Sequence, residues 1–104
     1  MIYLHITVHV VGIKTQEFHD FWSRESLPIW EKYGAKHIGS WTTTIGKNNE
    51  IIRLFAFPDM AHLEKWQRAM SEGPENKQLV QKLSPYLVGS EMKLLSPASY
   101  SPLK

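Results

Sequence analysis

The first eleven residues alternate between apolar and polar side chains, a pattern that strongly limits how the chain can fold. The apolar positions are Ile2, Leu4, Ile6, Val8 and Val10, and the positions between them are Tyr3, His5, Thr7 and His9. Such a period of two predicts a strand with one wholly apolar face. That face must be buried, most simply beneath helices. We therefore expect a sheet that is covered by helices on one side.

The remaining elements follow from helical spacing and turn residues. They are a helix over 14–33, a hairpin of strands over 36–46 and 50–57, two helices that begin at Asp59 and Pro74, and a last strand over about 87–95. In the first helix Pro28 predicts a kink or a division into two short helices, with Ser26 capping a fresh turn. The order β-α-β-β-α-α-β predicts an α+β, ferredoxin-like fold: one antiparallel sheet with helices on one face. The length of 104 residues leaves room for one domain, residues 1–104.

The sheet face opposite the helices is expected to be bare. In a chain of this size, an aromatic-containing sheet face left in water would form a large exposed patch. We expect the protein to cover that face by pairing with itself as a two-fold homodimer.

Composition and charge exclude several classes of protein. The formal charge is +2, and no basic stripe is interleaved with aromatic residues, so we expect no nucleic-acid partner. No apolar run reaches the roughly 18 residues of a membrane span. The opening run has no basic leader and does not resemble a signal peptide, so we expect a cytoplasmic protein. There is no cysteine, which excludes disulfides and thiolate chemistry.

The histidines do not form a metal site by spacing. His5 and His9 share a strand face but stand about 13 Å apart at the rise of a strand, so they cannot bind one metal together. His37 or His62 would have to converge on them, and no helical ligand spacing supports this. We expect no metal and no resident cofactor; haem held by a histidine is the cofactor alternative.

Arg53 lies in the middle of the strand expected over 50–57, with apolar neighbours on both sides. We expect Ile52, Leu54 and Ala56 to pack against the helices. This assignment places Arg53 on the bare face together with Phe55.

Pairing of this strand with the first would bring Arg53 near Tyr3, His5 or His9, inside the dimer. A guanidinium there needs an anionic partner, because an unpaired buried charge is costly. The partner is either structural, for example Glu91 on the last strand, or an acidic or enolate-like ligand.

Three of the four tryptophans, Trp22, Trp30 and Trp66, lie at helical spacing with other apolar residues, which favours core packing over stacking on haem or flavin. Trp41, on the second strand, could close the mouth of a barrel or face a ligand. The residues that we expect to line a ligand site are Tyr3, His5, His9, Trp41, Arg53 and Phe55.

Several short stretches recur in one order along nearly the whole chain: residues 1–3 (MIY), 21–28 (FWSRESLP), 31–34 (EKYG), 39–43 (GSWTT), 45–46 (IG), 96–97 (SP) and 101–103 (SPL). In these stretches the sequence resembles the NIPSNAP family. The resemblance implies a dimeric α/β barrel, in which two ferredoxin-like subunits pair their bare sheet faces. The wider fold group includes antibiotic-biosynthesis oxygenases, haem-degrading monooxygenases and muconolactone isomerases. The family itself implies no agreed reaction, and Leu4 and Ile6 stand where its members often carry Glu and Arg.

Two functions remain open from sequence. The first is a homodimeric module that binds a small hydrophobic, anionic molecule in the barrel cavity. The second is a cofactor-independent, or haem-dependent, monooxygenase or isomerase, with His5 or His9 as the base and Arg53 stabilising negative charge. A purely structural interaction protein would fit if Arg53 were paired and the interior filled. The sequence names neither the ligand nor which histidine matters.

Overall fold

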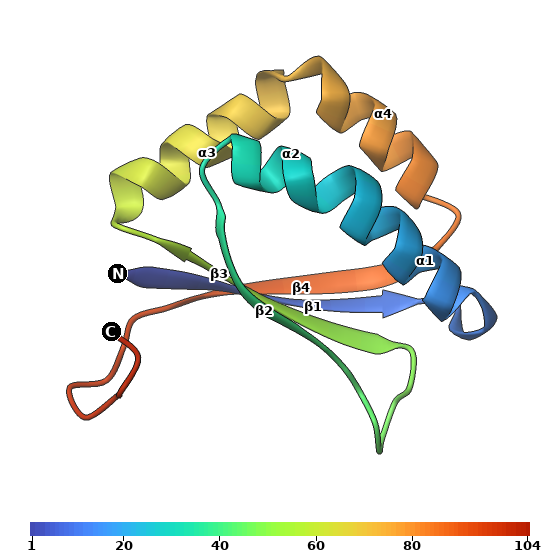
Figure 1. Cartoon of the computed structure of the whole chain (residues 1–104), viewed down its shortest axis with the longest axis horizontal. Coiled ribbons are helices and arrows are strands. Elements are labelled where there is room, and N and C mark those ends of the chain that lie inside the picture. The colour runs from blue at the N-terminus through green and yellow to red at the C-terminus, as the bar shows by residue number, and fades with distance from the viewer.

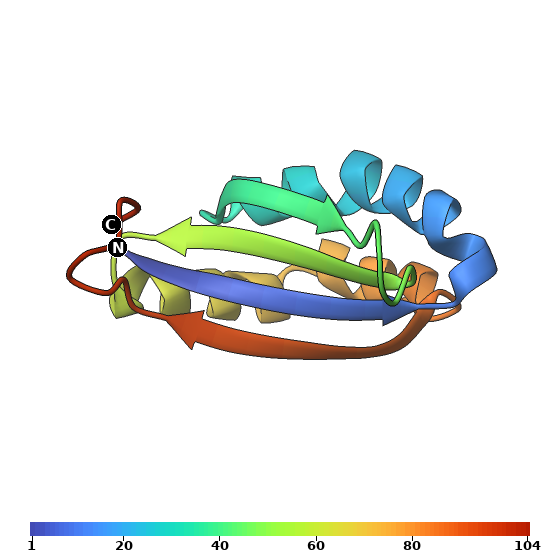
Figure 2. The same cartoon turned by 90° about the horizontal axis from the view of Figure 1, so that it is seen from below.

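The computed structural model describes residues 1–104, whose four strands form one antiparallel sheet in the order β2-β3-β1-β4. The strands are β1 (Ile2–Val10), β2 (Lys36–Thr42), β3 (Glu50–Phe57) and β4 (Leu87–Leu95). The helices are α1 (Thr15–Phe21), α2 (Leu27–Lys32), α3 (Met60–Glu72) and α4 (Pro74–Leu83). All four helices lie on one side of the sheet (Figure 1), and Figure 2 shows the strands from the uncovered side. None of the helices has the length and apolar character needed to span a membrane.

The alternation in β1 produces the face that was predicted. Leu4, Ile6, Val8 and Val10 are buried beneath the helices, whereas His5 on the other face is half-buried. β1 lies at the centre of the sheet, between β3 and β4. The predicted ferredoxin-like arrangement, with helices on one face, is confirmed.

The prediction for the two faces of β3 was wrong. The residues under the helices are Ile51, Arg53, Phe55 and Phe57, and those on the bare face are Ile52, Leu54 and Ala56. Both faces of this strand are apolar, so alternation alone does not orient it. The set with two phenylalanines removes more apolar area from water when it is buried. Arg53 lies in that set and is buried with it.

The first helical run continues past its proline instead of breaking into two capped helices. α1 and α2 are joined by a π-helical segment, Trp22–Ser26, in which the Leu27 N–H bonds to the Trp22 carbonyl five residues back. The wider turn comes just before Pro28, whose ring would clash with a carbonyl in a regular α-helix. Ser26 makes no capping hydrogen bond, so its predicted role as a cap was wrong.

The other helix signals act as predicted. The Asp59 carboxylate accepts a hydrogen bond from the His62 N–H at 2.9 Å and caps α3. Pro74 occupies the first turn of α4, where a missing N–H costs nothing. Gly34 ends the first helical run with a φ of 113°, a left-handed conformation that favours glycine.

Two segments extend beyond the bare face, at opposite ends of the sheet. One is the loop between β2 and β3, residues 43–49, and the other is the C-terminal tail, residues 96–104. Figure 1 shows both below the sheet, on the side away from the helices, with the tail beside the N-terminus. Figure 2, seen along the perpendicular direction, also places them at opposite ends of the strands.

Candidate functional site

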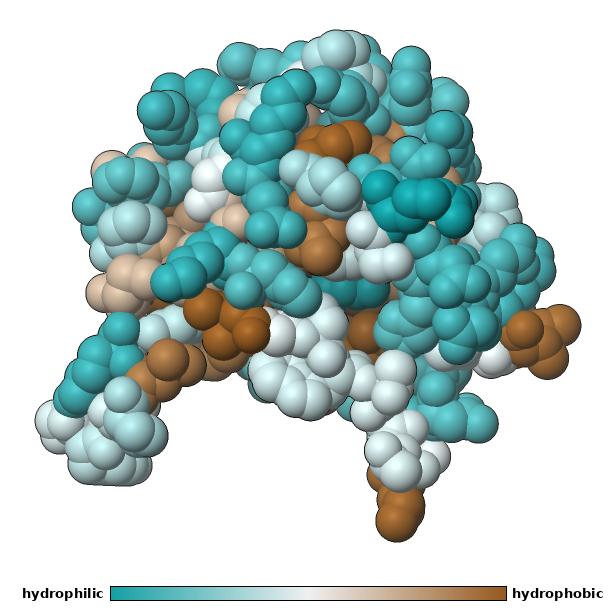
Figure 3. Space-filling view, viewed as in Figure 1, coloured by the Kyte–Doolittle hydropathy of each residue, from teal (hydrophilic) through white to brown (hydrophobic).

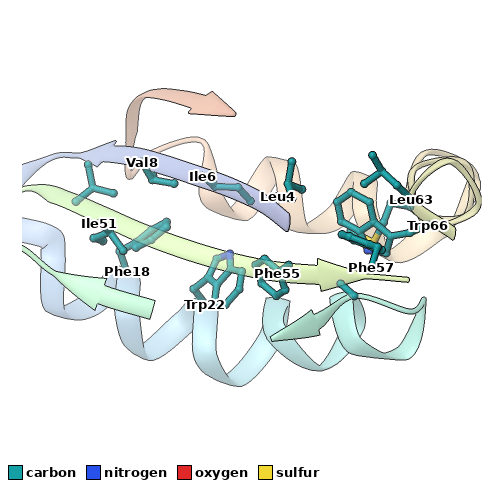
Figure 4. Packing of buried hydrophobic residues seen from close by; sticks show 13 residues of the cluster. Leu4, Ile6, Val8, Phe18, Trp22, Ile51, Phe55, Phe57, Leu63 and Trp66 are labelled. Carbon is teal, nitrogen blue, oxygen red and sulfur yellow. The ribbon is translucent and has the colours of Figure 1, made fainter. Parts of the chain in front are cut away.

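Arg53 lies between the sheet and the first helical run, and only 2% of its surface is exposed. Its Cζ lies 3.7 Å from the centroid of the Trp22 ring and 5.3 Å from that of Phe18. Figure 4 shows these two rings in the layer between helix and sheet, with Phe55 further along β3. The guanidinium is therefore held over an aromatic surface inside the apolar core.

No carboxylate lies within ion-pairing distance of Arg53, and its Nε has no hydrogen-bond acceptor. The structural ion pair with Glu91, one of the two expectations, is absent. Glu91 is exposed and pairs with Thr7, so it lies on the bare face while Arg53 lies under the helices. The positive charge has aromatic rings beside it but no anion.

The aromatic contact offsets only part of the cost of burying this charge. A desolvated cation over an aromatic ring gains about 2 kcal/mol, whereas removing an ion from water costs several kcal/mol. Burial lowers the pKa of Arg53 to about 10, so the side chain still carries its charge at neutral pH. A bound anion would remove the remaining penalty.

A cavity of about 130 Å³ opens beside the Arg53 side chain. We call it the Arg53 pocket; its walls include Phe18, Trp22, Trp30, Arg53, Leu83 and Met92. Leu87 and Met92 of β4 also line the pocket and are 41% and 59% exposed, so the pocket is open to solvent. An apolar cavity of roughly 150 Å³ is large enough for benzene, so this pocket suits a group of about one ring.

His19 adds a neutral imidazole near the same charge. It lies on α1 next to Phe18, and its Nε2 is buried without a hydrogen-bond partner. Burial lowers the pKa of His19, the positive charge of Arg53 lowers it further, and Asp20 opposes the shift. The folded protein therefore disfavours the charged form of His19, which is mainly unprotonated at neutral pH.

Buried polar atoms without partners concentrate in this layer. The structure contains four such side-chain atoms, and three of them are the His19 Nε2, the Ser26 Oγ and the Arg53 Nε. His19 and Ser26 belong to the first helical run, where the π segment places Ser26 fully inside. Native cores satisfy most of their polar groups, so a cluster of exceptions calls for an explanation such as a ligand or ordered water.

The residues predicted to line one site belong to two different faces. Tyr3, His5 and His9 lie on the bare face, as predicted from the alternation of the first strand, and Trp41, whose position the sequence left open, lies there too. Arg53 and Phe55 lie under the helices, so their predicted grouping with the first-strand histidines was wrong.

The Arg53 pocket does not fit haem. No histidine lines it, and its volume of about 130 Å³ is below the 300–1,000 Å³ typical of ligand pockets of drug size. No three His, Asp or Glu side chains lie close enough together to hold a metal ion.

Sequence reasoning missed the pocket residues Phe18, Trp22, Trp30 and Met92, and also His19. Trp22 and Trp66 are core residues, as predicted, and Trp30 packs against both at 5.6 and 4.9 Å between ring centroids. The signal that could have revealed the pocket is the larger apolar area on the Arg53 side of β3, which requires Arg53 to face the helices.

Comparison with known proteins places the chain within one family. The family model described as NIPSNAP matches residues 3–102. No curated protein matches the sequence.

Solved structures agree with this match. An uncharacterized NIPSNAP domain protein from Burkholderia xenovorans is 26% identical with a TM-score of 0.90, covering 98% of this chain and 99% of that one. A NIPSNAP family protein from Agrobacterium tumefaciens is 22% identical with a TM-score of 0.90, covering 99% and 98%. An antibiotic biosynthesis monooxygenase is 10% identical with a TM-score of 0.67, covering 94% and 99%; this likeness shows the fold alone.

Proposed function

Because the chain belongs to the NIPSNAP family and this membership does not imply a particular reaction, we propose a function from the geometry of the Arg53 pocket. The protein binds a small apolar anion, such as an aromatic carboxylate or an enolate, in the Arg53 pocket. It does so as a homodimer that is paired through the bare sheet face.

The observation that carries this proposal is a buried arginine without an anionic partner beside an apolar cavity. The guanidinium offers a fork of donors that matches a carboxylate, and its buried Nε has no acceptor within the protein. The aromatic walls suit the apolar body of the ligand, and the exposed leucine and methionine side chains of β4 also line the pocket, which is open to solvent.

The homodimer is supported by the apolar side chains of the bare face. Trp41 on β2 is 52% exposed and Leu95 on β4 is 40% exposed, and Ile52 and Leu54 on β3, between β2 and β1, are half-buried. No other layer covers this side of the sheet (Figure 1). A second sheet packed at about 10 Å would cover this face.

The alternative function, proton transfer by a first-strand histidine together with Arg53, loses its geometric support, because His5 and His9 lie on the other face of the sheet from Arg53 and no histidine lines the Arg53 pocket.

Binding is tested by titrating the protein with benzoate and with benzyl alcohol, its neutral counterpart, in a calorimeter. In Arg53→Met, benzoate should bind about 10- to 100-fold more weakly, because a charge-assisted hydrogen bond contributes about 1.5–3 kcal/mol. Benzyl alcohol should bind the variant and the original protein equally. Arg24→Met is the matched control, because Arg24 is an exposed arginine in the helical run that packs over Arg53.

Folding of the variant is checked by urea denaturation. Arg53→Met should be at least as stable as the original protein, because replacing an unpaired buried charge with an apolar side chain is often neutral or stabilising by about 1–4 kcal/mol. Equal losses of benzoate and benzyl alcohol affinity, or unchanged benzoate affinity, would contradict an anion site at Arg53. Marked destabilisation would instead assign Arg53 a structural role.

A further inference from the structure

The C-terminal tail borders a second apolar cavity, open to solvent, on the bare face and away from Arg53. Residues 96–104 turn back on themselves, with the Ser101 N–H donating to the Ala98 carbonyl at 2.9 Å and the Ser101 Oγ donating to the Leu103 carbonyl at 2.7 Å. The tail and the sheet together line about 440 Å³, with Tyr3, Leu54 and Leu95 contributed by the sheet. We call this cavity the tail pocket.

The opposite end of the same face carries an apolar side chain that is almost fully exposed to solvent. Ile45, in the loop between β2 and β3, is 94% exposed. The loop is anchored to the sheet by the Thr43 hydroxyl, which donates to the Glu50 carbonyl at 2.8 Å, and by the Asn49 amide, which donates to the Val10 carbonyl at 3.0 Å. Gly46, with a φ of 125°, turns the chain directly after Ile45. Figure 3 shows apolar surface at the far end of this projection.

The two features are placed so that two copies of the chain can exchange them. Both extend from the bare face, at opposite ends of the strands (Figures 1 and 2). In a face-to-face pair, a two-fold axis that runs across the strands reverses their direction. It sets the hairpin loop of each copy over the tail of the other, as a self-complementary interface requires. An axis along the strands would instead bring two hairpin loops together.

Charges on β4 favour the axis across the strands. Glu91 pairs with Thr7 and Lys93 with His5, so both side chains lie on the bare face, one on each side of Ile6 in the middle of β1. A two-fold axis that passes Ile6 and runs across the strands brings Glu91 of one copy over Lys93 of the other. The symmetry makes this contact twice per dimer. Complementary charges of this kind select one register of association over another.

We propose that Ile45 of each copy inserts into the tail pocket of its partner, so that the hairpin loop and the tail lock the homodimer in one orientation. This inference rests on the proposed homodimer and specifies its axis. The occupant is an aliphatic side chain of a second copy of this chain, and the tail pocket is incomplete without it.

Disulfide trapping tests the lock, because the chain has no cysteine of its own and engineered thiols are the only ones present. The double variant Ile45→Cys/Tyr100→Cys places a thiol at the loop and another at the tail; the second pair, Ile45→Cys/Leu103→Cys, probes another wall of the pocket. Ile45 and Tyr100 are 94% and 90% exposed, so their replacement should leave the fold intact. The controls are the three single-cysteine variants, and sedimentation before oxidation gives the oligomeric state of each protein.

After mild oxidation, at least one double variant should yield at least fivefold more covalent dimer on a non-reducing gel than any single variant. Equal trapping by Ile45→Cys alone would show that the loops meet each other, and would overturn the proposed axis. A dimer in sedimentation that neither double variant traps would overturn the lock and leave the homodimer standing. Monomers alone would overturn both.

Discussion

At the scale of single residues, the protonation of His19 makes the stability of the folded protein depend on pH. Burial and the Arg53 charge lower its pKa in the folded protein below the usual 6.5, with the Asp20 charge opposing. The unfolded chain therefore takes up more protons than the folded one as the pH falls below about 6.5. Protonation of His19 therefore favours unfolding. The contribution of neutral His19 to the stability of the folded protein is complete above pH 6.5 and declines below it.

We predict that the free energy of unfolding decreases as the pH is lowered from about 7 to 5, and that His19→Gln makes this decrease smaller. Urea denaturation at several pH values measures it. The acidic groups whose pKa is lowered in the folded state, Asp59 and Glu75, act only below this range, near their usual values of 3.8 and 4.5. An unchanged slope in the variant would show that the folded protein does not disfavour the charged imidazole.

At the scale of elements, α3 depends on one capping side chain. Asp59 accepts hydrogen bonds from both the backbone N–H and the ring Nδ1 of His62, at 2.9 and 2.7 Å. Leu63, Trp66 and Met70 on the same helix pack into the core, so loosening its first turn also disturbs the packing beneath it.

We predict that Asp59→Ala lowers the free energy of unfolding by about 1 kcal/mol, within the range of about 0.5–2 kcal/mol known for such caps. Asp59→Asn is the matched control, because asparagine caps nearly as well and loses only the charge. Chemical denaturation of the three proteins measures the difference. If Asp59→Ala and Asp59→Asn lower the free energy of unfolding equally, the charge pair with His62 and not the cap would be the stabilising contact.

The elements also show how far the sequence alone could lead. The bounds of β3 and β4 and the buried face of β1 were predictable, because alternation, turn residues and prolines are local signals. The orientation of β3 was not, because it is apolar on both faces and its side is decided by packing against the helices. The Arg53 pocket depends on that orientation and on the π segment, which sets where Trp22 and Ser26 point. Arg53 could therefore be predicted as a functional candidate, but its surroundings could not.

At the scale of the whole molecule, the chain is less compact than is usual for its length. Its radius of gyration is 14.2 Å, against about 13 Å for a typical chain of this size. A single sheet with helices on one side leaves its other side in water, and the proposed homodimer would complete the second half of the core.

We predict that the melting temperature rises with protein concentration, because association stabilises the folded state by mass action. Differential scanning fluorimetry between about 1 and 100 µM should show an increase of several degrees. Glu91→Lys, which turns the proposed Glu91–Lys93 contacts into repulsion, should reduce this increase, and the exchange Glu91→Lys/Lys93→Glu should restore it. A melting temperature independent of concentration would speak against association in this range.

The tryptophans of this protein divide into two optical groups. Trp22, Trp30 and Trp66 form a contiguous cluster of indoles in edge-on and tilted contacts, with ring centroids 5.6 and 4.9 Å apart, and two of them line the Arg53 pocket. Trp41 stands alone on the opposite side of the sheet. Near-ultraviolet circular dichroism reports the fixed packing of such rings. With Trp41 replaced by phenylalanine, the entire indole spectrum would come from the cluster around the pocket, and the protein would report the arrival of a ligand without any added dye.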